Sequence, residues 1–238
     1  MPSAKINLTI LIPAMNEAEN LRALLPGLHG VAKRCTPHYE IIVVDGGSTD
    51  GTSRAAESLG ARVVPQSRKG YGGALDAGFA AAVGEYVITM DADLSHPPTF
   101  VETLWRRRNE ADVVIASRYV PGGGAEMPRL RWALSRVLNV VFSRGMALNL
   151  HDVSSGFRLY SRGALSAINI TRTDFDVLEE ILIQAHRAGR RIVEAPFFYA
   201  ARRSGRSHAK LVRFGLAYLR LLIEMGLAPR KCNMSEES

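Results

Sequence analysis

The first half of this chain alternates short apolar runs with longer segments of helical character. We predict β-strands at 8–12, 40–44, 62–64, 86–90 and 113–116. We predict helices between them at 18–32, 52–59, 74–83 and 99–108. Apolar strands that alternate with helices build a mostly parallel sheet with helices on both faces. The sequence therefore predicts an α/β fold, and 238 residues suit one such domain.

Four polar or glycine-rich loops follow predicted strands directly, at 13–17, 45–50, 68–73 and 91–96. Ligands of a parallel sheet bind beyond the carboxyl ends of its strands, so we expect these loops to converge on one binding edge. After Tyr119 the pattern changes. We predict a glycine loop at 122–124, a helix at 129–149, a segment at 154–160, a helix at 176–188 and a strand at 192–198. We interpret this half as a part of the same domain that would face a second substrate.

Asp91 and Asp93 stand at positions i and i+2, where a strongly apolar strand runs into a loop. Two carboxylates so close repel each other, and a divalent cation or a hydrogen-bonding loop offsets that repulsion. A cation such as Mg²⁺ or Mn²⁺ also neutralises the charge that develops on a leaving nucleoside diphosphate. The alternative is a solvated turn that caps a helix at Pro97.

Two further loops suggest nucleotide contacts. Asp45 ends a strand before a flexible loop, so its carboxylate can accept hydrogen bonds from a nucleobase or ribose. Asp50 we interpret as the N-cap of the next helix. The segment 68–73 combines cations with a glycine-rich turn before a helix, which favours a phosphate or sugar hydroxyl. A simple strand-to-helix turn is its alternative.

Charge and cysteine content narrow the class of protein. Thirty Lys and Arg against 23 Asp and Glu give a net charge of +7, which favours anionic partners. The two cysteines, Cys35 and Cys232, lack metal-ligand spacing, which indicates a reducing compartment rather than a disulfide framework. We expect no membrane-spanning helix, since the best apolar stretch, 211–227, is interrupted by charged residues.

Seven ordered motifs between about Thr9 and Lys210 resemble those of one known family. They are Ile-Pro-Ala-Met-Asn-Glu ending at Glu17, Val-Val-Asp45-Gly-Gly-Ser-Thr-Asp-Gly-Thr, Gly70-Tyr-Gly-Gly-Ala, Asp91-Ala-Asp-Leu-Ser-His-Pro-Pro, Ala-Ser-Arg118-Tyr with Gly122-Gly-Gly, Ser154-Ser-Gly-Phe-Arg and Arg202-Arg-Ser-Gly-Arg-Ser. The chain resembles the family 2 glycosyltransferases with the Rossmann-like GT-A fold, and among them the polyprenyl-phosphate (dolichyl-phosphate) mannose synthases.

The resemblance implies inverting transfer of a sugar, mannose from GDP-mannose, to the phosphate of a polyprenyl lipid. It implies a nucleotide-sugar site of Pro13, Ala14, Asn16, Glu17, Asp45, Lys69, Gly72, Asp91, Ala92 and Asp93, with Mg²⁺ or Mn²⁺ on Asp91 and Asp93. It implies that Arg118, Arg131, Ser135 and Arg202 surround the acceptor phosphate, and that Asp91, Asp93 and the three arginines are catalytic. The chain departs from the family pattern at Gly46, Ser95 and His208.

A lipid phosphate is ionised at neutral pH, so it needs charge compensation rather than a general base, and arginine forks supply that compensation. We expect a catalytic domain at 1–210 and an amphipathic helix with a polar tail at 211–238. The segment 210–227 suits a helix at a membrane interface or a helix packed on the domain. We expect a peripheral protein on the cytoplasmic face of a membrane, docked directly or through a membrane partner.

Other functions stay open at this point. A related transferase with UDP-glucose or another nucleotide sugar, and a different acceptor, is the first alternative. A donor-binding pseudoenzyme is the second. A nucleic-acid-binding module would suit the net charge, but the basic residues lack interleaved aromatic runs, so we expect no nucleic-acid partner.

Overall fold

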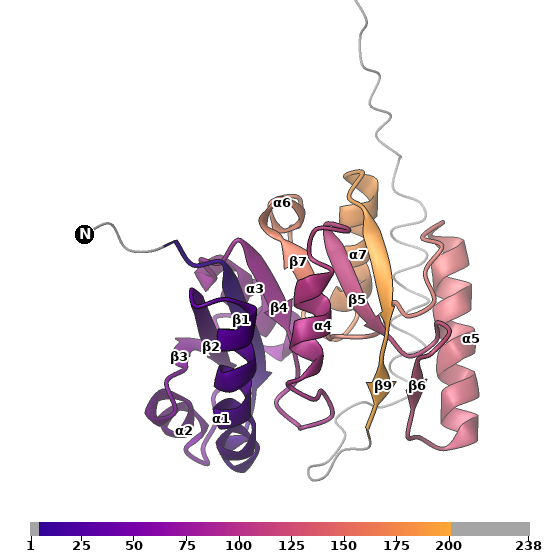
Figure 1. Cartoon of the computed structure of the whole chain (residues 1–238). Helices are drawn as coiled ribbons and strands as arrows, with labels where there is room; N and C mark the ends of the chain where they lie inside the picture. The colour runs from indigo at the N-terminus through magenta and orange to yellow at the C-terminus, as the bar shows by residue number, and fades with distance from the viewer. Residues whose placement is uncertain (1–4, 201–238) are drawn as a thin grey trace, which may run out of the picture.

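The computed structural model describes residues 5–200 of the chain. Its centre is a seven-stranded sheet in the order β3-β2-β1-β4-β7-β5-β8 (Figure 1). Neighbouring strands run parallel except at β7, which is antiparallel to both β4 and β5. The strands are β1 (Leu8–Ala14), β2 (Tyr39–Asp45), β3 (Arg62–Pro65), β4 (Tyr86–Thr89), β5 (Val113–Ser117), β7 (Arg158–Ser161) and β8 (Ile192–Pro196).

The register of the parallel strands brings their carboxyl ends to one edge. Ala14 at the end of β1 pairs with Asp45 at the end of β2. On the other side of β1, Leu11 pairs with Thr89, the last residue of β4. The loops after β1, β2 and β4 therefore begin next to one another, as the sequence predicts.

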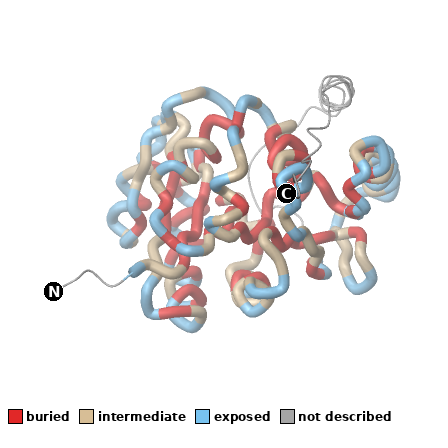
Figure 2. The backbone as a smooth tube through the Cα atoms, turned by 90° about the horizontal axis from the view of Figure 1, so that it is seen from above, coloured by how far each residue is buried: buried red, intermediate tan, exposed pale blue. Residues whose placement is uncertain are grey.

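Helices cover both faces of the sheet and enclose two apolar clusters. One cluster includes Leu21, Leu25 and Leu104 beneath α1 (Ala18–Cys35) and α4 (Phe100–Arg106), with α2 (Thr52–Ser58) beside them. The other includes Leu75 and Ile181 beneath α3 (Gly70–Ala81) and α7 (Val177–Arg187), with α6 (Arg162–Leu165) nearby. Figure 2 shows the buried chain through the middle of the molecule.

Helix α5 (Arg129–Gly145) stands apart at one end of the molecule (Figures 1 and 2). Only Asn139, Phe142 and Ser143 of its residues are buried. Beside it, β6 (Gly124–Ala125) and β9 (Phe198–Tyr199) pair as a short parallel ribbon. Within residues 5–200, no helix has the length and apolar character that crossing a bilayer demands.

Three expectations are wrong in detail. Residues 70–73 are not a turn before a helix but the first turn of α3. The N–H groups of a first turn have no partner within the helix, and Gly72 N donates instead to Thr173 O at 2.8 Å. A Cβ at Gly72 would lie 2.1 Å from Arg172 O, so only glycine permits this contact. Helix α5 ends at Gly145 rather than 149, since Ala147 takes a positive φ of 55°. The strand expected at 192–198 divides into β8 and β9.

Candidate active site

The loops after β1 and β2 are locked together by hydrogen bonds. Asn16 N donates to Ser48 Oγ at 2.9 Å, and Thr49 N donates to Asn16 Oδ1 at 2.9 Å. This exchange holds Asn16 in the left-handed region, with φ of 56°. The Asp50 carboxylate accepts from Ala18 N at 3.1 Å and from Thr52 N at 3.0 Å. Asp50 therefore bonds the first residues of both α1 and α2, while the N-cap position of α2 belongs to Gly51.

The Asp45 carboxylate is fixed by its own loop. Its Oδ1 accepts from Gly47 N at 3.2 Å, Ser48 N at 2.9 Å and Ser48 Oγ at 2.6 Å. Its Oδ2 accepts from Ser53 Oγ. Burial raises the pKa of Asp45, but the hydrogen bonds from Ser48 and Ser53 outweigh burial and leave the pKa below its usual range. Asp45 is thus an ionised acceptor in a fixed position.

Beside Asp45 lies a pocket of about 390 Å³, lined also by Gln66, Arg68 and Lys69. Gly46 leaves room there for Gln66, whose Oε1 would be 3.0 Å from a Cβ at position 46. The side-chain amide of Gln66 therefore lies against position 46, directly after Asp45. Lys69 is exposed at the start of α3, and Arg68 is tied to Asp76 and to Ile170 O, each at 2.9 Å.

The loop after β4 holds Asp91 and Asp93 with different partners. Asp91 N donates to Nδ1 of His96 at 3.0 Å, and Tyr71 donates its hydroxyl to Asp91 Oδ1 at 3.3 Å. Asp93 Oδ1 accepts from Ser95 N at 3.0 Å and from Ser95 Oγ at 2.5 Å. Ser95 thereby fixes a carboxylate that is only 6% exposed. The loop therefore holds the two carboxylates in an ordered arrangement. The helix after it starts only at Phe100, not at Pro97.

His96 and Tyr71 are supported by aromatic stacking. His96 is 4% exposed and stacks on Phe157 with ring centroids 4.6 Å apart. Tyr71 stacks on Phe175 at 4.7 Å. Burial, followed by the charge of Asp91, holds the pKa of Tyr71 well above its usual value, so its hydroxyl is a hydrogen-bond donor. Both residues lie inside motifs quoted from the sequence, yet no role for them follows from the sequence alone.

The carboxylate pair fits a hard divalent cation brought with a diphosphate. Residues 5–200 contain no group of three or more acidic, histidine or cysteine side chains that could enclose an ion by themselves. Mg²⁺ typically takes one or two protein carboxylates and completes its shell with water and substrate phosphates. Asp91 and Asp93 would supply oxygen ligands of that kind and number, and water and substrate phosphates would complete the shell.

The remaining residues assigned to the donor lie around the same edge. Ala14 and Ala92 are buried, Pro13 is half-buried, and Gly72 is buried beneath the backbone of Arg172. Glu17 is half-buried and accepts from Asn20 Nδ2 at 2.5 Å, while its own N–H donates to Thr52 Oγ1 at 2.9 Å. The predicted nucleotide-sugar residues therefore gather at the ends of β1, β2 and β4 and at the start of α3.

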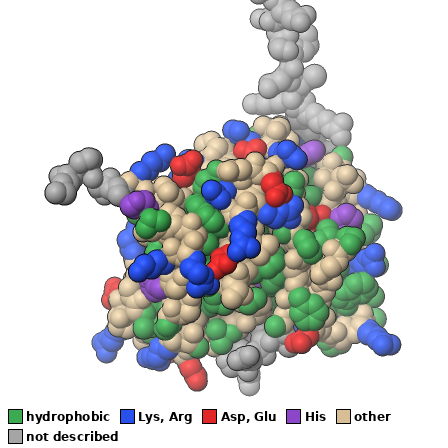
Figure 3. Space-filling model, in the orientation of Figure 1, with side chains coloured by type: hydrophobic (Ala, Val, Ile, Leu, Met, Phe, Trp, Pro, Cys, Tyr) green, Lys and Arg blue, Asp and Glu red, His purple; other side chains and the backbone are tan. Residues whose placement is uncertain are grey.

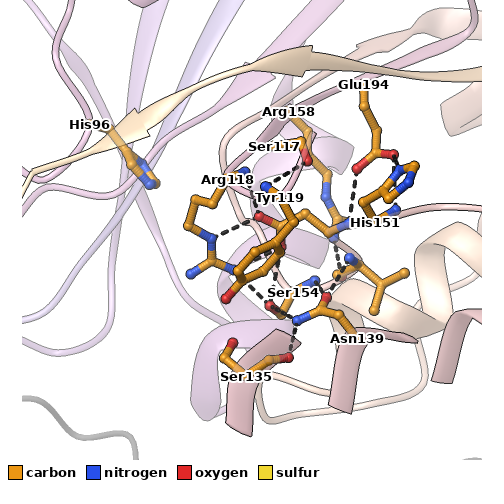
Figure 4. Close-up of polar contacts among 12 residues, drawn as sticks. His96, Ser117, Arg118, Tyr119, Ser135, Asn139, His151, Ser154, Arg158 and Glu194 are labelled. Carbon is orange, nitrogen blue, oxygen red and sulfur yellow. Dashed lines mark hydrogen bonds and ion pairs between the residues drawn. The ribbon is translucent and has the colours of Figure 1, made fainter. Parts of the chain in front are cut away.

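Arg118, assigned to the acceptor phosphate and labelled in Figure 4, forms an ion pair with a buried acid, Asp152, that sequence reasoning missed. Its Nε and Nη2 donate to the two oxygens of Asp152, each at 2.7 Å, and its backbone N–H donates to Oδ2 at 3.0 Å. Burial raises the pKa of Asp152, yet the charge and hydrogen bonds of Arg118 hold it below its usual range. Glu194 steadies the loop by accepting from His151 N and Asp152 N, both at 2.9 Å.

The other acceptor-side residues lie on α5 or beyond the described residues. Arg131 is exposed in the first turn of α5, and Ser135 is half-buried one turn later. Asn139 joins this helix to the Arg118 loop, and no sequence signal identified it because a lone helical asparagine is common. Arg202 and the segment 210–227 lie outside the described residues.

Comparison with known proteins places these features in a family. Residues 9–168 match the family described as Glycosyl transferase family 2. The chain is similar to the undecaprenyl-phosphate mannosyltransferase of Micrococcus luteus, with 34% identity over 83% of this chain and 85% of that protein. It is 32% identical to the polyprenol monophosphomannose synthase of Mycolicibacterium smegmatis, over 82% of this chain and 78% of that protein.

The dolichol-phosphate mannosyltransferase of Pyrococcus furiosus is 32% identical over 86% of this chain. The match spans 60% of that protein, less than two thirds of its length. Among solved structures, a complex of glucosyl-3-phosphoglycerate synthase from Mycobacterium tuberculosis with Mn²⁺, uridine diphosphate and phosphoglyceric acid has a TM-score of 0.71. That match covers 96% of this chain and 81% of the other at 22% identity, so it concerns the fold alone. The chain belongs to glycosyl transferase family 2, has the GT-A fold of that family, and is therefore a glycosyltransferase.

Proposed function

We propose that this glycosyltransferase moves mannose from GDP-mannose to a polyprenyl phosphate. The observation that carries the proposal is the ordered pair Asp91 and Asp93 at the same sheet edge as the Asp45 pocket, in a chain that is 32–34% identical to three named mannosyltransferases of lipid phosphates. The pocket lies at the carboxyl end of β2 and the carboxylate pair follows β4, on the two sides of β1 at one edge of the sheet, an arrangement that suits a nucleoside and its diphosphate.

The donor half of the site binds and orients. Asp45 Oδ2 accepts one bond from the protein and keeps room for a nucleoside donor. Asp91 and Asp93 would hold a divalent cation, which would supply positive charge to offset the charge that develops on the leaving diphosphate. Tyr71 and Ser95 hold the two carboxylates in place, so little reorganisation is needed when the donor binds.

The acceptor half compensates charge. A phosphate monoester carries its own negative charge, so it attacks the sugar without a protein base. What opposes the reaction is the approach of two anions, and arginine forks reduce that repulsion. We assign this role to Arg131 and Arg202, with Ser135 as a hydrogen-bonding partner. Arg118, which is paired with Asp152, we assign to the same acceptor phosphate.

Helix α5 offers a surface for the membrane that carries such a lipid. Its exposed apolar residues recur at helical spacing and form one stripe, Leu130, Leu134, Val137 and Val141. The helix contains four arginines and no acidic residue. Green and blue side chains lie together along the right edge of Figure 3, where α5 stands. Such a surface complements an anionic bilayer, so we propose peripheral docking of α5 on the cytoplasmic face.

Calorimetry and a transfer assay test the proposal on the full chain. GDP, UDP, GDP-mannose and UDP-glucose are titrated with Mn²⁺ and again with EDTA, and labelled mannose is followed into undecaprenyl phosphate. We expect Mn²⁺-dependent binding that prefers GDP-mannose, and label in the lipid fraction. Preference for a uridine nucleotide would instead establish a related transferase with another donor. Turnover only with a soluble phosphate acceptor would overturn the lipid assignment.

A further inference from the structure

Helix α5 is attached to the domain by very few buried side chains. Its first two and a half turns contain none, and Asn139 is the first buried residue along it, at 1% exposure. The apolar stripe of α5 includes Val137 and Val141, and Asn139 lies two residues from each, on the opposite side of the helix. Asn139 therefore faces the domain where the stripe faces solvent.

The Asn139 amide uses all of its hydrogen-bonding capacity in this position (Figure 4). Its Oδ1 accepts from Val153 N at 2.7 Å and from Ser154 N at 3.2 Å. Its Nδ2 donates to Ser135 O at 2.8 Å and to Ser154 Oγ at 3.2 Å. Asparagine supplies two donors and one two-site acceptor from one planar group, a combination that no other side chain of this length offers.

The loop that is hydrogen-bonded to Asn139 is also hydrogen-bonded to Arg118. Ser154 Oγ accepts from Arg118 Nη2 at 2.8 Å, and Asp152 in the same loop holds the rest of the guanidinium. A continuous run of hydrogen bonds therefore passes from Arg118 through Ser154 and Asn139 to the backbone of Ser135. This run of hydrogen bonds connects Arg118, which follows β5, with helix α5 through the loop that contains Ser154.

We propose that Asn139 is a positioning residue that sets the first half of α5, with Arg131 and Ser135, at a fixed place relative to Arg118. The inference rests on the proposed function, since it assigns the aligned groups to the acceptor phosphate. Packing alone does not call for an amide here, because Phe142, one turn later, supplies the fully buried apolar contact. A satisfied buried polar group fixes one arrangement of its partners, which is the property that an acceptor site requires.

The test compares Asn139→Ala with Ser143→Ala in the full chain. Ser143 is a matched control, because it is also a buried polar residue of α5 and its Oγ accepts from Leu150 N at 2.8 Å. Asn139→Asp is a second variant that keeps the acceptor bonds and loses both donors. The measurements are kcat/KM for farnesyl phosphate at saturating GDP-mannose, calorimetric affinity for GDP with Mn²⁺, and hydrogen exchange of the amides at 129–136.

Misplacement of a substrate group by about 1 Å costs on the order of 100-fold in rate, so Asn139→Ala should lose about tenfold to 100-fold in kcat/KM for farnesyl phosphate. Its GDP affinity should stay within about twofold, because the donor site shares no partner with it. Asn139→Asp should fall between wild type and Asn139→Ala. In Ser143→Ala neither parameter should change by more than about threefold, because the bond between Ser143 and Leu150 lies at the end of α5 that is away from residues 129–136.

Equal losses in the Asn139→Ala and Ser143→Ala variants, or parallel losses of acceptor and donor parameters, would overturn the positioning role. If wild type transfers no sugar to farnesyl phosphate, the acceptor assignment fails, and hydrogen exchange then decides the positioning role separately. Faster exchange at 129–136 in Asn139→Ala but not in Ser143→Ala supports it. Equal exchange in the two variants rejects it.

Discussion

Asp91 and Asp93 are close in sequence but are held by different neighbours. Asp91 contacts the aromatic residues Tyr71 and His96, whereas Asp93 is bonded to Ser95 within its own loop. The backbone N–H and the hydroxyl of Ser95 give Asp93 a fixed orientation. Two of the residues that hold the pair, Ser95 and His96, thus belong to the same motif as Asp91 and Asp93, and Tyr71 comes from the glycine-rich motif at the start of α3.

Removal of Asp93 should separate donor binding from folding. We expect Asp93→Ala to abolish Mn²⁺-dependent binding of GDP-mannose, because one carboxylate holds a divalent ion much less well than two. Circular dichroism should show an intact fold. Glu57→Ala, which removes an exposed acid from α2, is the control and should bind as wild type does. Unchanged metal-dependent binding in Asp93→Ala would contradict the metal assignment.

Asp152 should matter for stability as well as for the site. Removing one partner of a buried ion pair leaves the other charge unpaired, so Asp152→Ala should lower the free energy of unfolding by about 3–5 kcal/mol. Glu110→Ala breaks a surface pair with Arg107 and should have a much smaller effect. Urea denaturation measures both, and similar losses in the two variants would contradict the importance of burial.

The same pair gives stability a direction in pH. Because the pKa of Asp152 is lowered in the folded state, its contribution is present above the unfolded value of about 3.9 and is lost as pH falls below it. Denaturation midpoints of wild type should therefore fall more steeply between pH 5 and pH 3 than those of Asp152→Ala. Parallel profiles would indicate that Asp152 does not carry this linkage.

At the scale of elements, α5 combines an apolar stripe with a basic surround. Vesicle sedimentation tests the membrane proposal with Leu130→Ser/Leu134→Ser and with Val83→Ser as control. Val83 is 60% exposed and follows α3, so it matches the change in polarity elsewhere on the surface. We expect wild type to sediment with vesicles that contain phosphatidylglycerol and less with neutral vesicles, and the double variant to lose most binding. Binding by the double variant equal to wild type would place the membrane contact elsewhere.

The elements that the sequence predicts correctly are those whose apolar pattern is strong. Strands β1, β2 and β4 and helix α1 have strongly apolar, mostly buried sequences, and the loops after the strands mark the predicted donor edge because parallel strands end together. Strand β7 has only four residues, and its pairing between β4 and β5 is a long-range property that no local pattern reveals. Asp152 and Asn139 could not be identified from the sequence for the same reason, since their partners come from other segments of the chain.

At the scale of the whole molecule, donor binding should stabilise the fold. A ligand that binds only the native state at about 100 times its Kd adds about 2.7 kcal/mol to the free energy of unfolding. We expect GDP with Mn²⁺ to raise Tm, and GDP with EDTA to raise it much less. Thermal melts monitored by circular dichroism measure the difference. An equal rise in both conditions would show that the nucleotide binds without the cation.

The antiparallel β7 gives the sheet an order of completion during synthesis. As the chain leaves the ribosome, β4 and β5 emerge before the strand that separates them, so their facing edges have no hydrogen-bonding partner until Ser161 has been made. Unpaired strand edges invite pairing with other chains. The pairing of β7 therefore joins β4 to β5 before β8 is added at the far side of β5, and a nascent chain interrupted before Ser161 carries the loops after β1, β2 and β4 on an unfinished sheet.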